Sequence, residues 1–365
     1  MYNPDYLMMT AGPTMVRENV MKKRSIFFGN PDIDDDFFKF YDELKEKTSK
    51  IFGCSKSNIV FMSGEGMVGL DSACASLTEK GDRVLIIENG LFGSGFADLV
   101  KPYGGETATL HFDTKNKIDL ERLKDFLEID SDFKYATIVH CDTPTGVLND
   151  IEPICKLLKS KGILTVVDTV AAIGGEFFDV NKYGVDIALG GSQKVFSAPP
   201  GLTILSVSDE AWKVIKNRKT PITSFYCNLS YWQNCVENKL FPYTMPASDL
   251  IAFDQAIDNI LEEGIENVVE RHHKVAKYCR DKIQELGLKL YLEDGFSSTV
   301  TSFYVPKNFT PSEFIKELKE KHKILISGSF GEYSKYILRI GHMGESAKIE
   351  YIDKVILAIK DILNK

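Results

Sequence analysis

The fold is decided by two stretches, Leu164-Thr-Val-Val-Asp168 and Ile187-Ala-Leu-Gly-Gly-Ser-Gln-Lys194. Each begins with a short apolar run that predicts a buried strand, and each continues into polar residues. Ligands of open α/β sheets bind at the carboxyl ends of the strands, so Asp168 and Lys194 are expected to share one site. The chain between them is long enough for one helix and one strand.

Similar short apolar runs alternate with helical patterns through the first part of the chain. Further strands are predicted at 59–62, 83–87, 136–140 and 203–207, and helices at 34–52, 66–78, 94–103, 117–128, 150–161 and 179–183. Alternation of this kind predicts an α/β fold with a mostly parallel central sheet and helices on both faces.

The pattern changes after about Pro246. Long helical patterns cover 249–261 and 266–286, strand signals follow at 288–292, 299–304 and 336–340, and a further helix is predicted at 311–321. This mixture is typical of a smaller C-terminal α+β domain. We therefore expect a large domain over 16–250 and a small domain formed by 1–15 together with 251–365.

Composition excludes several classes of protein. The 365 residues are 44% hydrophobic and 26% charged, and the net charge of -8 without a basic cluster argues against a nucleic-acid partner. No apolar run approaches the ~20 residues that cross a bilayer, and no secretory signal is recognised, so we expect no membrane partner and a cytoplasmic location. The cysteines and histidines lack metal-ligand spacing, so no metal is expected.

Asp168 and Lys194 also indicate a cofactor chemistry. A carboxylate on a protonated pyridine nitrogen keeps a pyridoxal ring an electron sink, and a lysine one strand later can hold its aldehyde as a Schiff base. The turn Ser63-Gly-Glu-Gly-Met-Val-Gly69 follows a strand and opens a helix, where free N–H groups can bind a phosphate. Because this turn also matches a dinucleotide pattern, with Glu88 at the next strand end, a nicotinamide dehydrogenase remains an alternative.

Seven segments of the sequence are informative when taken together: Thr10-Ala-Gly-Pro-Thr14, Ser63-Gly-Glu-Gly66, Asn89-Gly-Leu-Phe-Gly93, His140-Cys-Asp-Thr-Pro-Thr-Gly146, the segments 167–175 and 191–201, and Leu338-Arg-Ile-Gly341. They occur in the order found in class V aminotransferases, and the sequence resembles that family over nearly its whole length. The chain looks most similar to the alanine–glyoxylate and serine–pyruvate aminotransferase branch and also resembles 2-aminoethylphosphonate–pyruvate aminotransferases. The resemblance implies a fold type I pyridoxal-phosphate-dependent transferase, pyridoxal 5′-phosphate as cofactor, and a homodimer with shared active sites.

The resemblance also implies a role for individual residues. Lys194 would bind the aldehyde of the cofactor and move a proton, and Asp168 would bind the pyridine nitrogen. Phe92 would stack on the ring, while Arg339 and the backbone of Gly12 would hold the substrate carboxylate. The other expected cofactor contacts are Glu65, Gly66, Met67, Thr143, Gln193 and, toward the neighbouring subunit, Thr244.

Three positions depart from the family pattern near the expected phosphate. Glu65 stands where relatives usually carry a small polar residue, and an added carboxylate there disfavours a phosphate. Met67 brings no side-chain donor. Phe241 replaces a tyrosine that reaches the phosphate of the partner subunit.

The expected activity is transfer of an amino group from a small amino acid, alanine or serine, to a small 2-oxo acid, glyoxylate or pyruvate. Transamination between 2-aminoethylphosphonate and pyruvate is the first alternative. A cysteine desulfurase-like lyase is the second, and it is disfavoured because Gln193 precedes the lysine where such lyases typically carry a histidine, and because no cysteine follows Cys279.

Overall fold

The computed structural model describes residues 5–364, and its largest sheet has seven strands. Their order is β2 (Ile59–Ser63), β10 (Leu202–Val207), β9 (Ile187–Gly191), β8 (Leu164–Asp168), β5 (Tyr135–Val139), β3 (Arg83–Glu88) and β4 (Glu106–His111). Neighbouring strands are parallel except at β10, which runs antiparallel to both β2 and β9. The predicted α/β fold with a mostly parallel sheet is confirmed.

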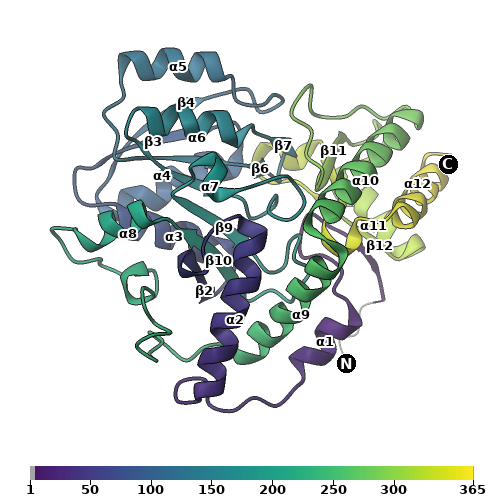
Figure 1. Cartoon of the computed structure of the whole chain (residues 1–365). Helices are drawn as coiled ribbons and strands as arrows, with labels where there is room; N and C mark the ends of the chain where they lie inside the picture. The colour runs from purple at the N-terminus through teal and green to yellow at the C-terminus, as the bar shows by residue number, and fades with distance from the viewer. Residues whose placement is uncertain (1–4, 365) are drawn as a thin grey trace.

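Helices pack on both sides of this sheet (Figure 1). They are α2 (Asp35–Phe52), α3 (Gly66–Leu77), α4 (Leu91–Val100), α5 (Leu120–Ile129), α6 (Ile151–Ser160), α7 (Val180–Tyr183) and α8 (Asp209–Lys216). The first of the long ones, α2, begins where the side chain of Asp34 accepts a hydrogen bond from the N–H of Asp36, and it ends at Gly53, whose φ of 67° is left-handed. Its buried stripe, which includes Tyr41 and Leu44, holds it on the large core.

A second sheet of four strands has the order β1 (Leu7–Met9), β12 (Ile324–Gly328), β13 (Ile337–Gly341) and β11 (Val300–Tyr304). The first strand comes from the start of the chain and pairs in parallel with β12. Helices α10 (Ile265–Glu285), α11 (Pro311–His322) and α12 (Ile349–Leu363) pack around this sheet (Figure 1).

Two buried hydrophobic clusters meet inside α10. Val268 belongs to the cluster of the large sheet, and Val275 belongs to the cluster of the small one. The helix α9 (Ala247–Glu263) precedes α10 and contributes to the larger cluster. The division into 16–250 and 1–15 with 251–365 stays a prediction.

Some local predictions differ from the structure. The strand expected at 288–292 is wrong, because only Leu290 bridges to Phe303. The following elements were not predicted: β1, α1 (Glu18–Arg24), β4, the hairpin of β6 (Cys141–Asp142) and β7 (Val147–Leu148), α8, β12 and α12. At β4 the reason is its place at the edge of the sheet, where most side chains stay partly exposed and no apolar run is needed. Among residues 5–364 no helix has the length and apolar character of a membrane span.

Candidate active site

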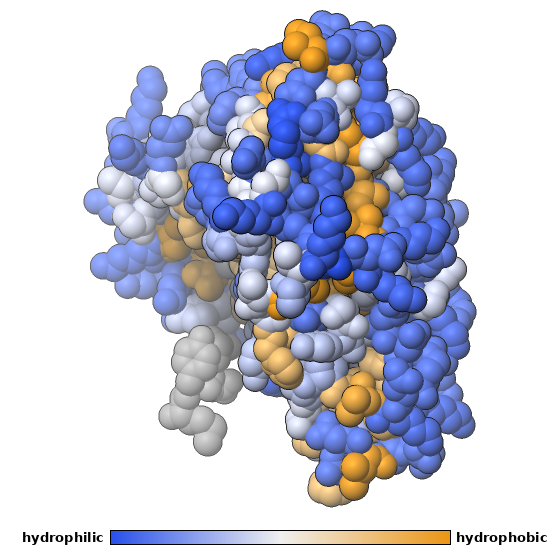
Figure 2. Space-filling view, turned by 90° about the vertical axis from the view of Figure 1, so that its left-hand side faces the viewer, coloured by the Kyte–Doolittle hydropathy of each residue, from blue (hydrophilic) through white to orange (hydrophobic). Residues whose placement is uncertain are grey.

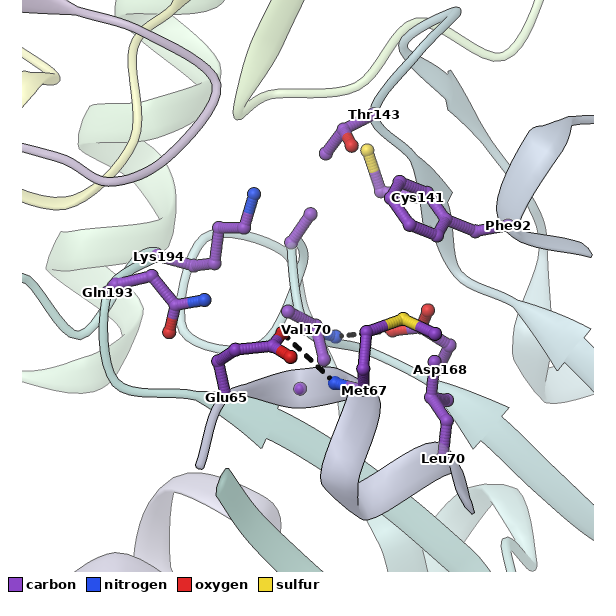
Figure 3. Close-up of a pocket in the computed structure, with 12 residues that line it drawn as sticks. Glu65, Met67, Leu70, Phe92, Cys141, Thr143, Asp168, Val170, Gln193 and Lys194 are labelled. Carbon is purple, nitrogen blue, oxygen red and sulfur yellow. Dashed lines mark hydrogen bonds between the residues drawn. The ribbon is translucent and has the colours of Figure 1, made fainter. Parts of the chain in front are cut away.

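The parallel strands β8 and β9 lie side by side and lead into one pocket. Asp168 is the last residue of β8, and Lys194 lies in the turn that joins β9 to β10. Both side chains line the pocket, and Figure 3 shows the amine of Lys194 directed into it. The juxtaposition expected from the two strand ends is therefore present.

Lys194 is partly buried. Its Nζ donates a hydrogen bond of 2.5 Å to the backbone oxygen of Ala11. Burial and the positive charge of Arg339 lower the pKa of Lys194 to about 8, although the carboxylates of Asp168 and Glu65 act in the opposite direction. A lysine with a lowered pKa carries more of the neutral amine, which is the form that attacks an aldehyde.

Asp168 is a buried carboxyl group, and no cation within the described part of the chain is bonded to it. Its Oδ1 accepts a hydrogen bond of 2.9 Å from the N–H of Val170. Burial raises the pKa of Asp168 to about 6, and this effect outweighs the nearby charge of Lys194. A protonated pyridine nitrogen would give this carboxylate a positive partner, so the residue fits the ring of a pyridoxal compound.

The start of α3 forms a further wall of the pocket. Glu65 precedes the helix, and its Oε2 accepts a hydrogen bond of 3.1 Å from the N–H of Met67 (Figure 3). Gly66 is required for the close approach to the end of β8, because a Cβ there would lie 2.7 Å from Cγ2 of Val170. Gln193 also lines the pocket, and its Oε1 has no hydrogen-bond partner within the described chain.

Phe92 and Thr143 complete the pocket on the side away from Glu65. The ring of Phe92 stands in the wall beside Cys141 (Figure 3), and its N–H donates to Oδ2 of Asp142 over 2.8 Å. Asp142 also accepts a longer bond from the N–H of Gly93, at 3.4 Å. Sequence reasoning did not single out Asp142, although it lies inside the motif at 140–146; it anchors the start of α4 and so the ring of Phe92.

Arg339 reaches the site from β13 of the small sheet. Its Nε donates to the oxygen of Gly328 over 2.7 Å, and its Nη1 donates to the oxygen of Thr143 over 2.9 Å. The ring of Phe330 lies 5.0 Å from the guanidinium carbon. Burial lowers the pKa of Arg339 to about 10. Nη2 makes no hydrogen bond within residues 5–364, so it remains available to a carboxylate.

Gly12 lies against Lys194 rather than on the pocket wall. Its φ is +86°, and a Cβ there would lie 2.4 Å from Cδ and 2.7 Å from Nζ of the lysine. The backbone at this position therefore approaches the amine as only glycine permits.

Thr244 and Phe241 lie away from the pocket of their own chain. The hydroxyl of Thr244 donates to Oδ2 of Asp32 over 2.8 Å. Its expected contact with a neighbouring subunit stays a prediction. Phe241 is buried and stacks on Phe38, with ring centroids 4.7 Å apart, so it contributes to the core.

A mostly parallel sheet whose strand ends present a lysine and a buried carboxylate is the arrangement of fold type I pyridoxal-phosphate enzymes. The family model described as aminotransferase class-V matches residues 6–342. An uncharacterized aminotransferase of Methanocaldococcus jannaschii is 35% identical over 361 residues, which cover 98% of this chain and 93% of the relative.

Solved structures give the same result. The alanine–glyoxylate aminotransferase of Nostoc sp. has a TM-score of 0.95 at 26% identity, with 100% of this chain and 96% of that chain covered. The pyridoxamine–pyruvate aminotransferase of Mesorhizobium loti has a TM-score of 0.94 at 28% identity, with 99% and 93% covered. The chain belongs to the class V aminotransferase family and is a transaminase of that class, and membership implies dependence on pyridoxal phosphate.

Proposed function

We propose that this transaminase moves an amino group from alanine or serine to a small 2-oxo acid such as glyoxylate or pyruvate. The observation that carries the proposal is that Lys194, with its lowered pKa, lines the same pocket as the buried carboxylate of Asp168. The likeness to a structure named alanine–glyoxylate aminotransferase supports this substrate class. Pyridoxal 5′-phosphate is the cofactor that family membership implies.

The ring of a bound pyridoxal compound supplies an electron sink for the bond that breaks at the substrate's α carbon. Asp168 keeps the proton on the ring nitrogen, because its carboxylate is buried and makes no salt bridge within residues 5–364. Lys194 takes the proton from the α carbon of the substrate and gives it to the carbon of the ring's aldehyde group. Phe92 holds the face of the ring, and Thr143 offers a hydroxyl at its edge.

Arg339 orients the substrate in this proposal. Nη2 of its guanidinium is free for the carboxylate that amino acids and 2-oxo acids share, while Nε and Nη1 are held by backbone oxygens. The two fixed bonds keep the group at one place, so a carboxylate gains a rigid charged partner. Because the arginine comes from the small sheet, substrate binding also depends on how the small sheet packs on the large one.

A homodimer is part of the proposal. Several large apolar side chains are exposed in the segments 26–33 and 225–240, among them Phe27 (93% exposed), Ile33 (79%) and Leu240 (68%). Hydrophobic groups also reach the surface near the lower end of the face in Figure 2. Exposed apolar groups of this size favour burial against another chain. The cytoplasmic location and the lack of a nucleic-acid or membrane partner remain expectations.

The lyase alternative loses support from the state of the cysteines. All seven are buried or partly buried, and Cys141, which lines the pocket, is buried. Burial raises the pKa of Cys141 to about 12, which disfavours the thiolate that sulfur transfer needs. Transamination from 2-aminoethylphosphonate to pyruvate remains the alternative function, so this compound is included as a donor in the test.

The test follows the visible absorbance of the protein loaded with pyridoxal or its phosphate, while alanine, serine or 2-aminoethylphosphonate is added without an acceptor. Loss of the band with alanine or serine, and its return with glyoxylate or pyruvate, supports the proposal. Loss with 2-aminoethylphosphonate alone would move the assignment to that donor. Lys194→Ala is the control, and it should show neither the band nor the exchange.

A further inference from the structure

The N-terminus of α3 already binds a negatively charged group of this chain, the side chain of Glu65. The N-terminus of a helix attracts negative charge, and α3 with its 12 residues directs its first N–H groups toward the pocket. In this chain the carboxylate of Glu65 occupies that end, because Oε2 accepts the N–H of Met67 over 3.1 Å. A phosphate group of a ligand would have to share the same positive end with this carboxylate.

Among residues 5–364, no cation is free to compensate for a second anion. Lys194 and Arg339 are the basic groups that act on the site, and the first is the amine that must react with the aldehyde. Arg339 directs its fixed donors to the oxygens of Gly328 and Thr143. The side chain of Met67 provides no donor. The pocket therefore offers the ring of a pyridoxal compound the carboxylate of Asp168, but within residues 5–364 it offers a 5′-phosphate no free cation.

A neutral hydroxyl group fits the same place. Oε1 of Glu65 has no hydrogen-bond partner in the part of the chain that the structure describes, so it can accept from a ligand. Gln193 lines the pocket beside it with only 8% of its surface exposed, and its buried Oε1 lacks a partner as well. The buried oxygen of Gln193 lacks a donor, and the exposed carboxylate of Glu65 beside it can also accept, so the two favour a ligand group that donates a hydrogen bond, such as an alcohol.

We propose that the pocket takes the pyridine ring without its phosphate, as pyridoxamine or pyridoxal, and that Glu65 accepts the hydrogen bond of the ring's 5-hydroxymethyl group. This inference rests on the proposed transamination and changes one element of it. The ring becomes a substrate that enters and leaves, because the strong anchor of a phosphate is absent.

The net reaction exchanges an amino group for an oxygen. Pyridoxamine and pyruvate give pyridoxal and alanine: the ring's aminomethyl carbon loses two electrons and becomes an aldehyde, and C2 of the oxo acid gains two electrons and the amino group. The oxygen of the oxo acid is released as water, and another water supplies the aldehyde oxygen. Lys194 carries a proton from the methylene carbon to C2, so no further oxidant or reductant is required.

Binding is measured first, by titrating the full chain with pyridoxal and separately with pyridoxal 5′-phosphate and recording the visible band. The wild-type protein should bind pyridoxal at least as tightly as the phosphate. Glu65→Ser should reverse the order, raising the affinity for the phosphate about tenfold or more and weakening that for pyridoxal. Asp119→Ser is the matched control, since Asp119 likewise caps a helix, α5, away from the pocket, and it should leave both affinities unchanged.

Turnover separates this inference from the proposed function. Formation of alanine and pyridoxal from pyridoxamine and pyruvate, faster than the same reaction with pyridoxamine 5′-phosphate, supports the inference. A clear preference for the phosphorylated forms, in binding and in turnover, would overturn it and leave the transaminase assignment standing. If neither pyridoxamine nor pyridoxamine 5′-phosphate transferred its amino group, both the inference and the proposed function would be overturned. Equal loss of both affinities in Glu65→Ser would also refute the role of Glu65.

Discussion

Nζ of Lys194 donates a hydrogen bond of 2.5 Å to the backbone oxygen of Ala11, 183 residues away in the chain. The bond connects the turn after β9 to the segment that follows β1, and so it connects the large sheet to the small one. The backbone of the same turn is held by Thr14, whose hydroxyl donates to the oxygen of Lys194 over 3.0 Å. The position of the reactive amine is therefore set by residues from the beginning of the chain.

Gly12→Ala should displace the amine of Lys194. The added Cβ would lie within 3 Å of Cδ, Cε and Nζ, and alanine disfavours the φ of +86°. A misplacement of about 1 Å costs on the order of 100-fold in rate, so we expect a loss of that size in kcat. Stopped-flow absorbance would measure bond formation with pyridoxal, and thermal unfolding would check the fold. A folded variant with the wild-type rate would contradict this account of the amine's position.

Replacing Arg339 with lysine tests whether substrate binding needs the shape of the guanidinium group as well as its positive charge. Arg339→Lys keeps a positive charge but loses the guanidinium fork, so the KM for both amino acid and oxo acid should rise about 10- to 100-fold, the range of a charge-assisted hydrogen bond. Affinity for the pyridine ring should change little. Steady-state kinetics with each substrate measures the first effect, and the visible titration measures the second. An unchanged KM would rule out the carboxylate contact.

Arg339→Ala should in addition change the pH dependence. The arginine's charge lowers the pKa of Lys194, so its removal should move that pKa upward. The rate of bond formation with pyridoxal depends on the neutral amine and should then reach its plateau at a higher pH than in Arg339→Lys. Rate profiles of the two variants, recorded side by side, test this. A plateau at the same pH in both would mean that the charge of Arg339 does not act on the amine.

The sequence located Asp168 and Lys194 because buried parallel strands are short apolar runs, and the residues after them must face the same edge of the sheet. The same reasoning could not find β4, whose place at the edge of the sheet removes the apolar signal. Asp142 was missed for another reason. Its structural role depends on the hydrogen bonds that it accepts from the N–H groups of Phe92 and Gly93, and these residues come close to it only in the folded chain.

Glu65 and Thr244 mark two further limits of sequence reasoning. A carboxylate beside the expected phosphate stood out in the sequence, but its explanation as the cap of α3 needs the bond to the N–H of Met67. Thr244 donates to Asp32 in its own chain, so any role in a neighbouring pocket depends on a surface that forms only between two copies.

In the wild-type protein, the decrease at low pH in the rate of bond formation with pyridoxal should follow the protonation of Lys194. Below pH about 8 the amine is mostly protonated, so the rate of its attack on pyridoxal should fall about tenfold for each unit of pH and level off above pH 8. The carboxylate of Asp168 raises this pKa, so Asp168→Asn should move the fall to lower pH while reducing turnover through the loss of the pyridinium partner. Stopped-flow absorbance across the pH range measures both. If the rate of Asp168→Asn instead fell at a higher pH than that of the wild-type protein, Asp168 would not raise the pKa of Lys194.

Asp142 should make stability depend on pH. It is buried, its Oδ1 has no partner among the described residues, and burial raises its pKa from an ordinary 3.8 to about 7. Because the folded state binds the proton more tightly than the unfolded state, this group favours folding below pH 4, and its contribution is lost as the pH rises through 7.

Asp142→Asn removes that titration and keeps an oxygen that can accept the N–H of Phe92. The unfolding free energy of the wild-type protein, relative to the variant, should therefore fall by about 1–3 kcal/mol between pH 5 and pH 8. Urea unfolding of both proteins at each pH measures the difference, and using the difference cancels the titration of Asp168 and Lys194. A constant or rising difference over this range would show that Asp142 stays ionised in the folded chain.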